Sequence, residues 1–205
     1  MAERRYDAVV FDLLTALIDS WTLWNAVAGS EEAGLRWRRR YLELTYRAGV
    51  YTPYEGLVGR AAVETGGGAE LAGELVRRWS ELPPWPETHA VVTELARRVP
   101  LGIVTNCSQR LGLIAADRAG GPFAAVMTAE SVGYYKPRPE TYRAVLDALN
   151  ADPARVLFVA GSAADVPGAR GAGMTVYWHN RIGLKPLDGA PDFTETSLHR
   201  LLELV

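Results

Sequence analysis

The chain has 205 residues, of which 48% are hydrophobic and 22% are charged, and its formal net charge is −2. This is the composition of a globular protein with enough apolar side chains for a core, and so small a charge gives no support to a nucleic-acid partner. The single cysteine, Cys107, excludes an internal disulfide, and no apolar stretch approaches the roughly 20 residues of a membrane span. The N-terminus shows no long apolar segment followed by a cleavage site. We therefore expect a soluble, cytoplasmic protein without a membrane partner.

The first predicted element is a buried strand that ends on a carboxylate. Residues Ala8 to Phe11 form a short apolar run, which is typical of a central strand in a parallel sheet, and Asp12 follows directly. A carboxylate in this place is costly unless it is paired or used. Ligands of open α/β sheets bind at the carboxyl ends of the strands. Asp12 is therefore the leading candidate for a functional residue.

The next sixty or so residues have helical periodicity and no strand-like alternation. Their apolar spacing predicts helices at 21–28, 35–46, 57–63 and 71–79, with breaks at 49–53 and at 66–68. The proline-rich segment 83–86 predicts a linker. We expect an all-helical cap over residues 18–83, inserted into a core made of residues 1–17 and 84–205.

Helices and strands alternate after this linker. The pattern predicts strands at 101–105, 124–128, 156–159 and 175–178, and helices at 87–98, 111–119, 139–149, 165–172 and 196–204. Such alternation indicates an α/β fold with a doubly wound, mostly parallel, Rossmann-like sheet. The helical cap would then lie above the carboxyl edge of the sheet, over Asp12.

Several polar residues follow the predicted strands or precede the helices that come after them. They are Thr105, Asn106, Lys136, Ser162 and Asp165. Because the carboxyl ends of parallel strands meet at one edge of a sheet, we expect these side chains near Asp12. An acid nucleophile, a lysine that keeps it ionised and a second acid would suit nucleophilic displacement.

Each of these residues has a plainer interpretation when it is taken alone. Asp12 and Asp165 could be turn or N-cap residues, and an isolated Lys136 would most often be solvated. Their conjunction in this order argues against that interpretation. Cys107 is interpreted as a small buried thiol, and His179, after a strand, has no predicted partner.

The motifs that contain these residues resemble those of the haloacid dehalogenase (HAD) superfamily, over essentially the whole chain. In order they are Phe11-Asp12, Val104-Thr105-Asn106, Lys136-Pro137, and residues 161–165 with Gly171-Ala172-Gly173 behind them. The resemblance implies a hydrolase with a Rossmann-like core, a cap and an aspartate nucleophile.

Most members of this superfamily are magnesium-dependent phosphatases, and the chain departs from their pattern at two positions. Their second aspartate, a general acid two positions after the nucleophile, corresponds to Leu14. Their magnesium-binding Gly-Asp pair corresponds to Ala160-Gly161, so that carboxylate is missing. Since magnesium prefers carboxylate oxygens, the resemblance implies no metal and no other cofactor.

The chain is more similar to the metal-free branch, the L-2-haloacid dehalogenases. Residues 11–14 resemble the first motif of that branch, and Arg38 falls where it has a halide-binding arginine. Lys136 and Tyr142 match its lysine and tyrosine, and residues 178–181 resemble a segment near its carboxyl end.

The chain also departs from this branch in ways that concern the substrate more than the nucleophile. A Gly-Thr pair after the first motif is replaced by Thr15-Ala16, so a threonine hydroxyl near the nucleophile is lost or displaced. Ala160 and Ser162 replace a serine and an asparagine that help to hold the substrate carboxylate and the hydrolytic water.

The resemblance implies a metal-independent hydrolase that acts by two displacements on a small anionic organic substrate. Asp12 would attack a carbon next to a carboxylate, and water would then hydrolyse the Asp12 ester. Lys136 would keep Asp12 ionised, and Asp165 would position Lys136 or the water. The remaining expected site residues are the catalytic Thr105 and, for the substrate or leaving group, Arg38, Asn106, Tyr142, Ser162 and Leu14.

Two other functions stay open at this stage. One is a divergent magnesium-dependent phosphatase that uses Asp12, Asp165 and the carbonyl of Leu14. The other is a non-catalytic binding protein that kept the HAD fold. Activity on 2-haloacids or on phosphate esters, measured with and without a chelator, separates the three. The oligomeric state is also open, with a homodimer as one option.

Overall fold

Six parallel strands form one sheet in the computed structural model, which describes residues 5–187 and 189–205. The strands are β1 (Ala8–Phe11), β2 (Leu101–Thr105), β3 (Phe123–Thr128), β4 (Val156–Ala160), β5 (Thr175–His179) and β6 (Phe193–Glu195). Their order is β3-β2-β1-β4-β5-β6, so β1 is central and pairs with β2 and β4. The predicted α/β fold with a doubly wound parallel sheet is confirmed.

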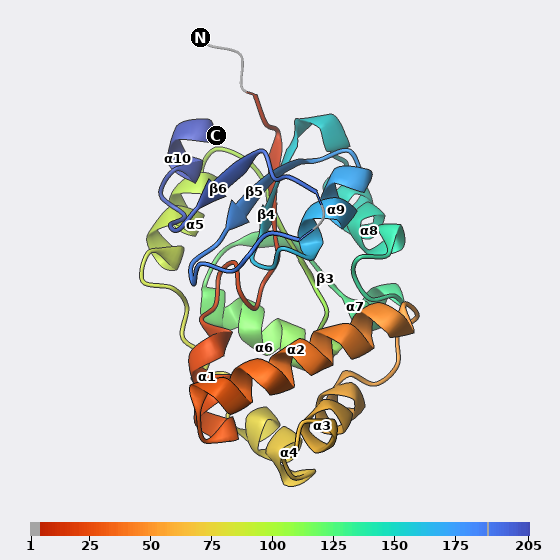
Figure 1. Cartoon of the computed structure of the whole chain (residues 1–205). Coiled ribbons are helices and arrows are strands. Elements are labelled where there is room, and N and C mark those ends of the chain that lie inside the picture. Colours follow the sequence, from red (N-terminus) through yellow and green to blue (C-terminus); the bar gives the residue numbers. More distant parts are fainter. Residues whose placement is uncertain (1–4, 188) are drawn as a thin grey trace.

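Helices cover both faces of this sheet (Figure 1). Helices α5 (Thr88–Ala96), α6 (Gln109–Ala119) and α10 (Leu201–Leu204) lie on one face, and α8 (Pro139–Leu149) and α9 (Asp165–Gly171) lie on the other. Successive side chains of a strand point to opposite faces. Val9 and Phe11 therefore join the first hydrophobic cluster, and Ala8 and Val10 the second. Both faces of β1 are buried, which explains its continuous apolar run.

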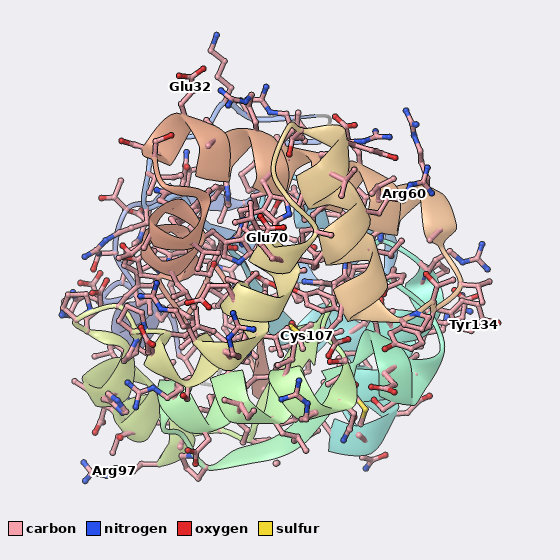
Figure 2. The ribbon with its side chains drawn as sticks, turned by 90° about the horizontal axis from the view of Figure 1, so that it is seen from below. Glu32, Arg60, Glu70, Arg97, Cys107 and Tyr134 are labelled. Atoms are coloured by element: carbon pink, nitrogen blue, oxygen red, sulfur yellow. The ribbon has the colours of Figure 1, made fainter. Side chains whose placement is uncertain are left out.

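The segment between β1 and α5 contains no strand. It forms α1 (Ser20–Ala28), α2 (Glu31–Ala48), α3 (Tyr54–Glu64), α4 (Glu70–Arg77) and a short 3₁₀ turn, η1 (Trp79–Glu81). Helix α2 runs across the carboxyl edge of the sheet, and α3 and α4 lie beyond it (Figure 1). Figure 2 views the molecule from this side, with Glu32, Arg60 and Glu70 marking the three helices. The exact bounds of the two predicted domains stay a prediction.

The segment leaves and re-enters the sheet-containing part at one place. Ile18 and Pro84 form an isolated antiparallel bridge. The backbone N–H of Asp19 donates to the carbonyl of Pro83 over 2.8 Å, and that of Trp85 donates to Leu17 over 3.0 Å. The two connections are therefore hydrogen-bonded to each other.

Buried aromatic rings hold the helical segment together and fix it to the sheet. Ring centroids are 4.6 Å apart for Trp24 and Trp37, and 5.3 Å apart for Tyr41 and Tyr54. The indole N–H of Trp79 donates to the carbonyl of Leu111 in α6 over 2.9 Å. These contacts place α2 at a defined position over the carboxyl ends of the strands.

The sequence-based prediction was wrong at the carboxyl end. A single helix was expected over 196–204, but the structure has strand β6 and only the short helix α10. Phe193 to Glu195 pair with β5 and form the edge of the sheet, and Asp192 accepts the N–H of Val176 over 2.8 Å. A strand of three residues carries too little periodicity to be recognised in the sequence.

Within the described ranges, no helix is long and apolar enough to cross a membrane.

Candidate active site

Asp12 lies directly after β1, and its buried carboxylate is held at both oxygens. The ammonium of Lys136 is 2.7 Å from Oδ1. The hydroxyl of Thr15 donates to Oδ2 over 2.9 Å, and the Thr15 backbone N–H is 3.4 Å from the same oxygen. Two donors on opposite oxygens fix the plane of the carboxylate.

Lys136 also contacts the second predicted acid. Its Nζ is 3.2 Å from Oδ2 of Asp165, the first residue of α9. Asn106, which follows β2, fixes the backbone that carries the lysine. It accepts the Lys136 N–H over 2.7 Å and donates to the Lys136 carbonyl over 3.3 Å. The structure therefore brings together four of the residues that were expected at this edge of the sheet.

The charges of this cluster set the protonation of its members. Burial would raise the pKa of Asp12, but the charge and hydrogen bond of Lys136 outweigh it and lower that pKa. Burial would likewise lower the pKa of Lys136, which its two carboxylate neighbours raise instead. For Asp165, burial prevails over the attraction of Lys136 and raises the pKa to about 6. At neutral pH, Asp12 is thus an ionised carboxylate beside a charged lysine.

A second buried cation comes from α2. Arg38 is only 4% exposed, and one of its N–H groups donates to the hydroxyl of Ser20 over 2.5 Å. The Ser20 hydroxyl in turn donates to the carbonyl of Leu14. The guanidinium stacks over Trp21, 4.3 Å from the ring centroid. Its Nε–H is buried and has no hydrogen-bond partner among the described residues, which leaves a donor for an anion.

A cavity of about 60 Å³ joins these groups. It is lined by Asp12, Leu14, Thr15, Trp21, Arg38, Tyr41, Leu42, Tyr46, Thr105, Asn106, Lys136, Gly161, Ser162, Asp165 and Leu184. Of the site residues predicted from the sequence, only Tyr142 is not part of this lining. Its buried hydroxyl is 3.5 Å from the backbone carbonyl of Asp165. Tyr142 can therefore support the position of Asp165, but it is not placed to contact a molecule in the cavity.

Several lining residues were missed by the sequence analysis. Two of them, Leu42 and Tyr46, follow the predicted Arg38 at intervals of four residues along α2, so the three share one face of that helix. This spacing was a usable signal once Arg38 had been chosen. Leu184 lies in the loop between β5 and β6, where no periodicity could have identified it.

Two of the predicted residues have partners close to their own position. The hydroxyl of Thr105 contacts the sulfur of Cys107 at 3.3 Å, and that of Ser162 accepts the N–H of Ala164 over 3.3 Å. Cys107, labelled in Figure 2, is fully buried, and burial raises its pKa to about 12. The thiol is therefore protonated and inert, as the sequence analysis expected.

The threonine hydroxyl near the nucleophile is displaced, not lost. Thr15 stands one position before the expected threonine, and its hydroxyl still reaches Asp12. Gly161 makes room for it. A Cβ at Gly161 would lie 2.2 Å from the Thr15 hydroxyl oxygen and 2.3 Å from the Ala16 nitrogen. Neither alanine nor aspartate fits at position 161 with the loop in this arrangement.

The residues present do not fit a magnesium ion. The ammonium of Lys136 lies between the carboxylates of Asp12 and Asp165, and the Leu14 carbonyl already accepts the Ser20 hydroxyl. Gly161 has no space for a third carboxylate. Within the described part of the chain, no group of three or more His, Cys, Asp or Glu side chains could hold a metal. A hard dication would find too few free oxygen ligands here.

Comparisons with known proteins match this chain over most of its length. A family model described as haloacid dehalogenase-like hydrolase matches residues 6–173. Haloacetate dehalogenase H-2 of Moraxella sp. (strain B) is 26% identical, over 98% of this chain and 99% of its own.

A solved structure and a phosphatase add to this comparison. The L-2-haloacid dehalogenase RSc1362 superposes with a TM-score of 0.86 at 28% identity, over 97% of both chains. The phosphoserine phosphatase of Thermus thermophilus is 36% identical, over 68% of this chain and 60% of its own. The proteins that are similar to this chain thus include a phosphatase as well as dehalogenases.

Replacing Lys136 with methionine tests the electrostatics of the cluster. The pKa values of Asp12 and Asp165 should both rise, because burial would no longer be opposed by the ammonium. The variant should also lose about 3–5 kcal/mol of unfolding free energy at pH 7, since two buried charges lose their partner. Carbon-detected NMR of labelled aspartate and urea unfolding measure the two effects. Unchanged carboxylate pKa values in a folded variant would contradict this account.

Proposed function

Because this chain belongs to the haloacid dehalogenase-like hydrolase family, we propose that it hydrolyses a carbon–halogen or related bond in a small carboxylate, with Asp12 as the nucleophile and without a metal. The observation that carries the proposal is the ionised Asp12 carboxylate, oriented by Lys136 and Thr15, in one small cavity with Arg38. Family membership confirms the expectation of an enzyme and of this superfamily. The substrate, the metal independence and the roles below belong to the proposal.

In the first step, an oxygen of Asp12 attacks the substrate carbon that bears the leaving group. The new carbon–oxygen bond forms as the bond to the leaving group breaks, and the leaving group departs with the electron pair as an anion. Lys136 and Thr15 hold the attacking carboxylate ionised and oriented. Arg38, which has an unused buried N–H, receives the anion.

In the second step, water attacks the carbonyl carbon of the Asp12 ester. The bond between this carbonyl carbon and the product oxygen breaks, one proton of the water goes to the product hydroxyl and the other is released to solvent, and the Asp12 carboxylate is restored. Asp165 is suited to accept a proton from this water, since its pKa of about 6 leaves it largely ionised at neutral pH yet basic enough to act. Lys136 connects both acids and stabilises the negative charge that develops.

The size and walls of the cavity limit the substrate. A volume of about 60 Å³ holds a few water molecules or one short-chain acid. Leu14, Trp21, Leu42 and Leu184 give it apolar walls, which exclude water from the first displacement. These features support a small 2-substituted carboxylic acid as the substrate class.

The proposal also covers the setting of the enzyme. A single, buried and protonated cysteine suits the reducing cytoplasm, where we place the protein. Its partner in this proposal is the small acid alone. Assembly into a homodimer stays a prediction.

A single turnover in oxygen-18 water tests the covalent mechanism. With enzyme in excess over a 2-haloacid, the label should enter the Asp12 carboxylate, because water attacks the ester carbonyl and not the substrate carbon. Mass spectrometry of the Asp12 peptide would detect it. An Asp12→Asn variant is the control and should take up no label. Label found only in the product hydroxyl would mean that water attacks the substrate directly.

Metal dependence separates this function from phosphate-ester hydrolysis. Turnover of 2-haloacids should be unchanged after treatment with EDTA and should not rise with added magnesium, because the site lacks free oxygen ligands. Phosphate esters, phosphoserine included, should not be hydrolysed under either condition. A strict magnesium requirement together with phosphatase activity would overturn the present proposal and support a magnesium-dependent phosphatase instead.

Arg38→Lys tests the binding of the leaving anion. Lysine keeps the charge but loses the planar group that stacks on Trp21, so kcat should fall about 10–100-fold. Arg39→Lys is the matched control, since Arg39 is the next residue of α2 but is exposed and outside the cavity lining. Equal activity of the two variants in steady-state assays would remove Arg38 from the site.

A further inference from the structure

Three side chains that are distant in the sequence contact backbone carbonyls of the loop that follows Asp12. Residues 15–17 have consecutive backbone carbonyls, and each of them meets one side-chain nitrogen or hydroxyl, at 3.0, 2.9 and 2.8 Å. The three groups are, in that order, the indole N–H of Trp85, Nδ1 of His179 and the hydroxyl of Thr88. Three consecutive carbonyls of the loop are therefore each fixed by a side chain that does not line the cavity.

The position of His179 determines which of its ring nitrogens carries a proton. A carbonyl oxygen only accepts hydrogen bonds, so Nδ1, 2.9 Å from the carbonyl of Ala16, must be the donor. Nε2 is buried without a hydrogen-bond partner in the described chain. The charged groups near the ring are Glu87, 4.0 Å from Nε2, and Arg181. Burial lowers the pKa of His179 although Glu87 and the backbone carbonyls of Ala16 and Thr196 favour the charged ring, so the ring is neutral at pH 7, and its contact with Ala16 puts the proton on Nδ1.

His179 and Trp85 are themselves locked in place. Glu87 accepts a hydrogen bond from Arg181 over 2.7 Å and one from the Leu198 N–H over 3.3 Å. The Arg181 guanidinium stacks on Trp85, 5.1 Å from the ring centroid. The rings of Trp85 and His179 meet edge to face at 6.2 Å. Neither ring can turn away from the loop without breaking these contacts.

The Ala16 carbonyl that His179 holds belongs to the residue next to Thr15. On the other side, the backbone at Gly161 comes so close that an added Cβ would lie 2.3 Å from the Ala16 nitrogen. The peptide units on both sides of Ala16 are thus clamped between Gly161 and His179. Thr15, whose hydroxyl donates to Oδ2 of Asp12 over 2.9 Å, directly precedes this clamped residue.

We propose that His179 is a positioning residue for the nucleophile: by donating from Nδ1 to the Ala16 carbonyl, it holds Thr15 in the orientation that fixes the Asp12 carboxylate. The proposal rests on the proposed function for the role of Asp12. It assigns a task to a buried imidazole that touches neither the substrate nor the reacting atoms.

Two amide variants separate this role from simple packing. His179→Asn places an amide nitrogen near the position of Nδ1 and can still donate to Ala16. His179→Gln places its amide near Nε2 and cannot donate to Ala16 in the same geometry. We expect formation of the Asp12 ester, measured in single turnover, to be about tenfold slower in H179Q and restored mostly in H179N. Substrate KM should change little. Equal rates in two folded variants would overturn the proposal.

A double-mutant cycle shows whether His179 acts through Thr15. Thr15→Val removes the hydroxyl at nearly constant volume and should slow ester formation on its own. If His179 works by aiming that hydroxyl, H179Q should cause no further loss in the T15V background. Additive losses would mean that His179 does not act through Thr15 and would overturn the proposal.

A measurement on the wild-type enzyme decides the matter if a variant fails to fold. Nitrogen-15 NMR of histidine-labelled protein reports which ring nitrogen is protonated. The buried His179 should show a protonated Nδ1 across neutral pH, whereas His89 and His199 are exposed and serve as internal references. An unprotonated Nδ1 would overturn the proposal. This measurement needs no substrate, so it stands even if 2-haloacids are not turned over, a result that would count against the proposed function instead.

Discussion

The interaction on which the rest of the site depends is the ammonium of Lys136 between two buried carboxylates. Its Nζ lies 2.7 Å from Asp12 and 3.2 Å from Asp165, and all three side chains are almost fully buried. Removal of so much charge from water is tolerable only when the charges compensate one another. Because the three residues come from distant parts of the sequence, this compensation also fixes how β1, β4 and the segment before α8 meet. The same cation that compensates the two carboxylates keeps Asp12 ionised.

This arrangement also shows how one fold can serve different chemistry. The three positions that matter for a metal, 12, 14 and 161, hold one carboxylate, one carbonyl with its own partner, and a glycine pressed against Thr15. An aspartate at 161 would have to displace the Thr15 hydroxyl. In this arrangement the Thr15 hydroxyl, which orients Asp12, therefore occupies the space that a carboxylate at position 161 would need.

The sequence predicted five of the six described strands and about half of the cavity lining. The residues at the strand ends follow from short-range patterns, whereas Arg38 and Leu14 came from the family resemblance. A buried strand ending on Asp12, and polar residues after later strands, are visible along the chain and meet by the geometry of parallel sheets. Thr15 was harder, because its role depends on a displacement of one residue that only the backbone reveals. His179 could not be assigned at all, since its partner is a backbone carbonyl more than 160 positions away. Leu184 and strand β6 lie in stretches too short or irregular for periodicity.

The paired connections at Ile18 and Pro84 have a consequence for how such a chain can be rebuilt. Because the chain leaves and returns at adjacent, hydrogen-bonded points, the segment between them has to span only a short distance from end to end. Closing a loop costs free energy that grows only slowly with its length, so a longer, shorter or different insert can start from the same two ends. A replacement would also have to restore the packing of the present helices, whose buried side chains share one hydrophobic cluster with β1 and α6. Since the helical segment supplies Arg38 and the Trp21 and Leu42 part of the cavity wall, its exchange would reshape the cavity while Asp12, Lys136 and Asp165 stay in the sheet-containing part.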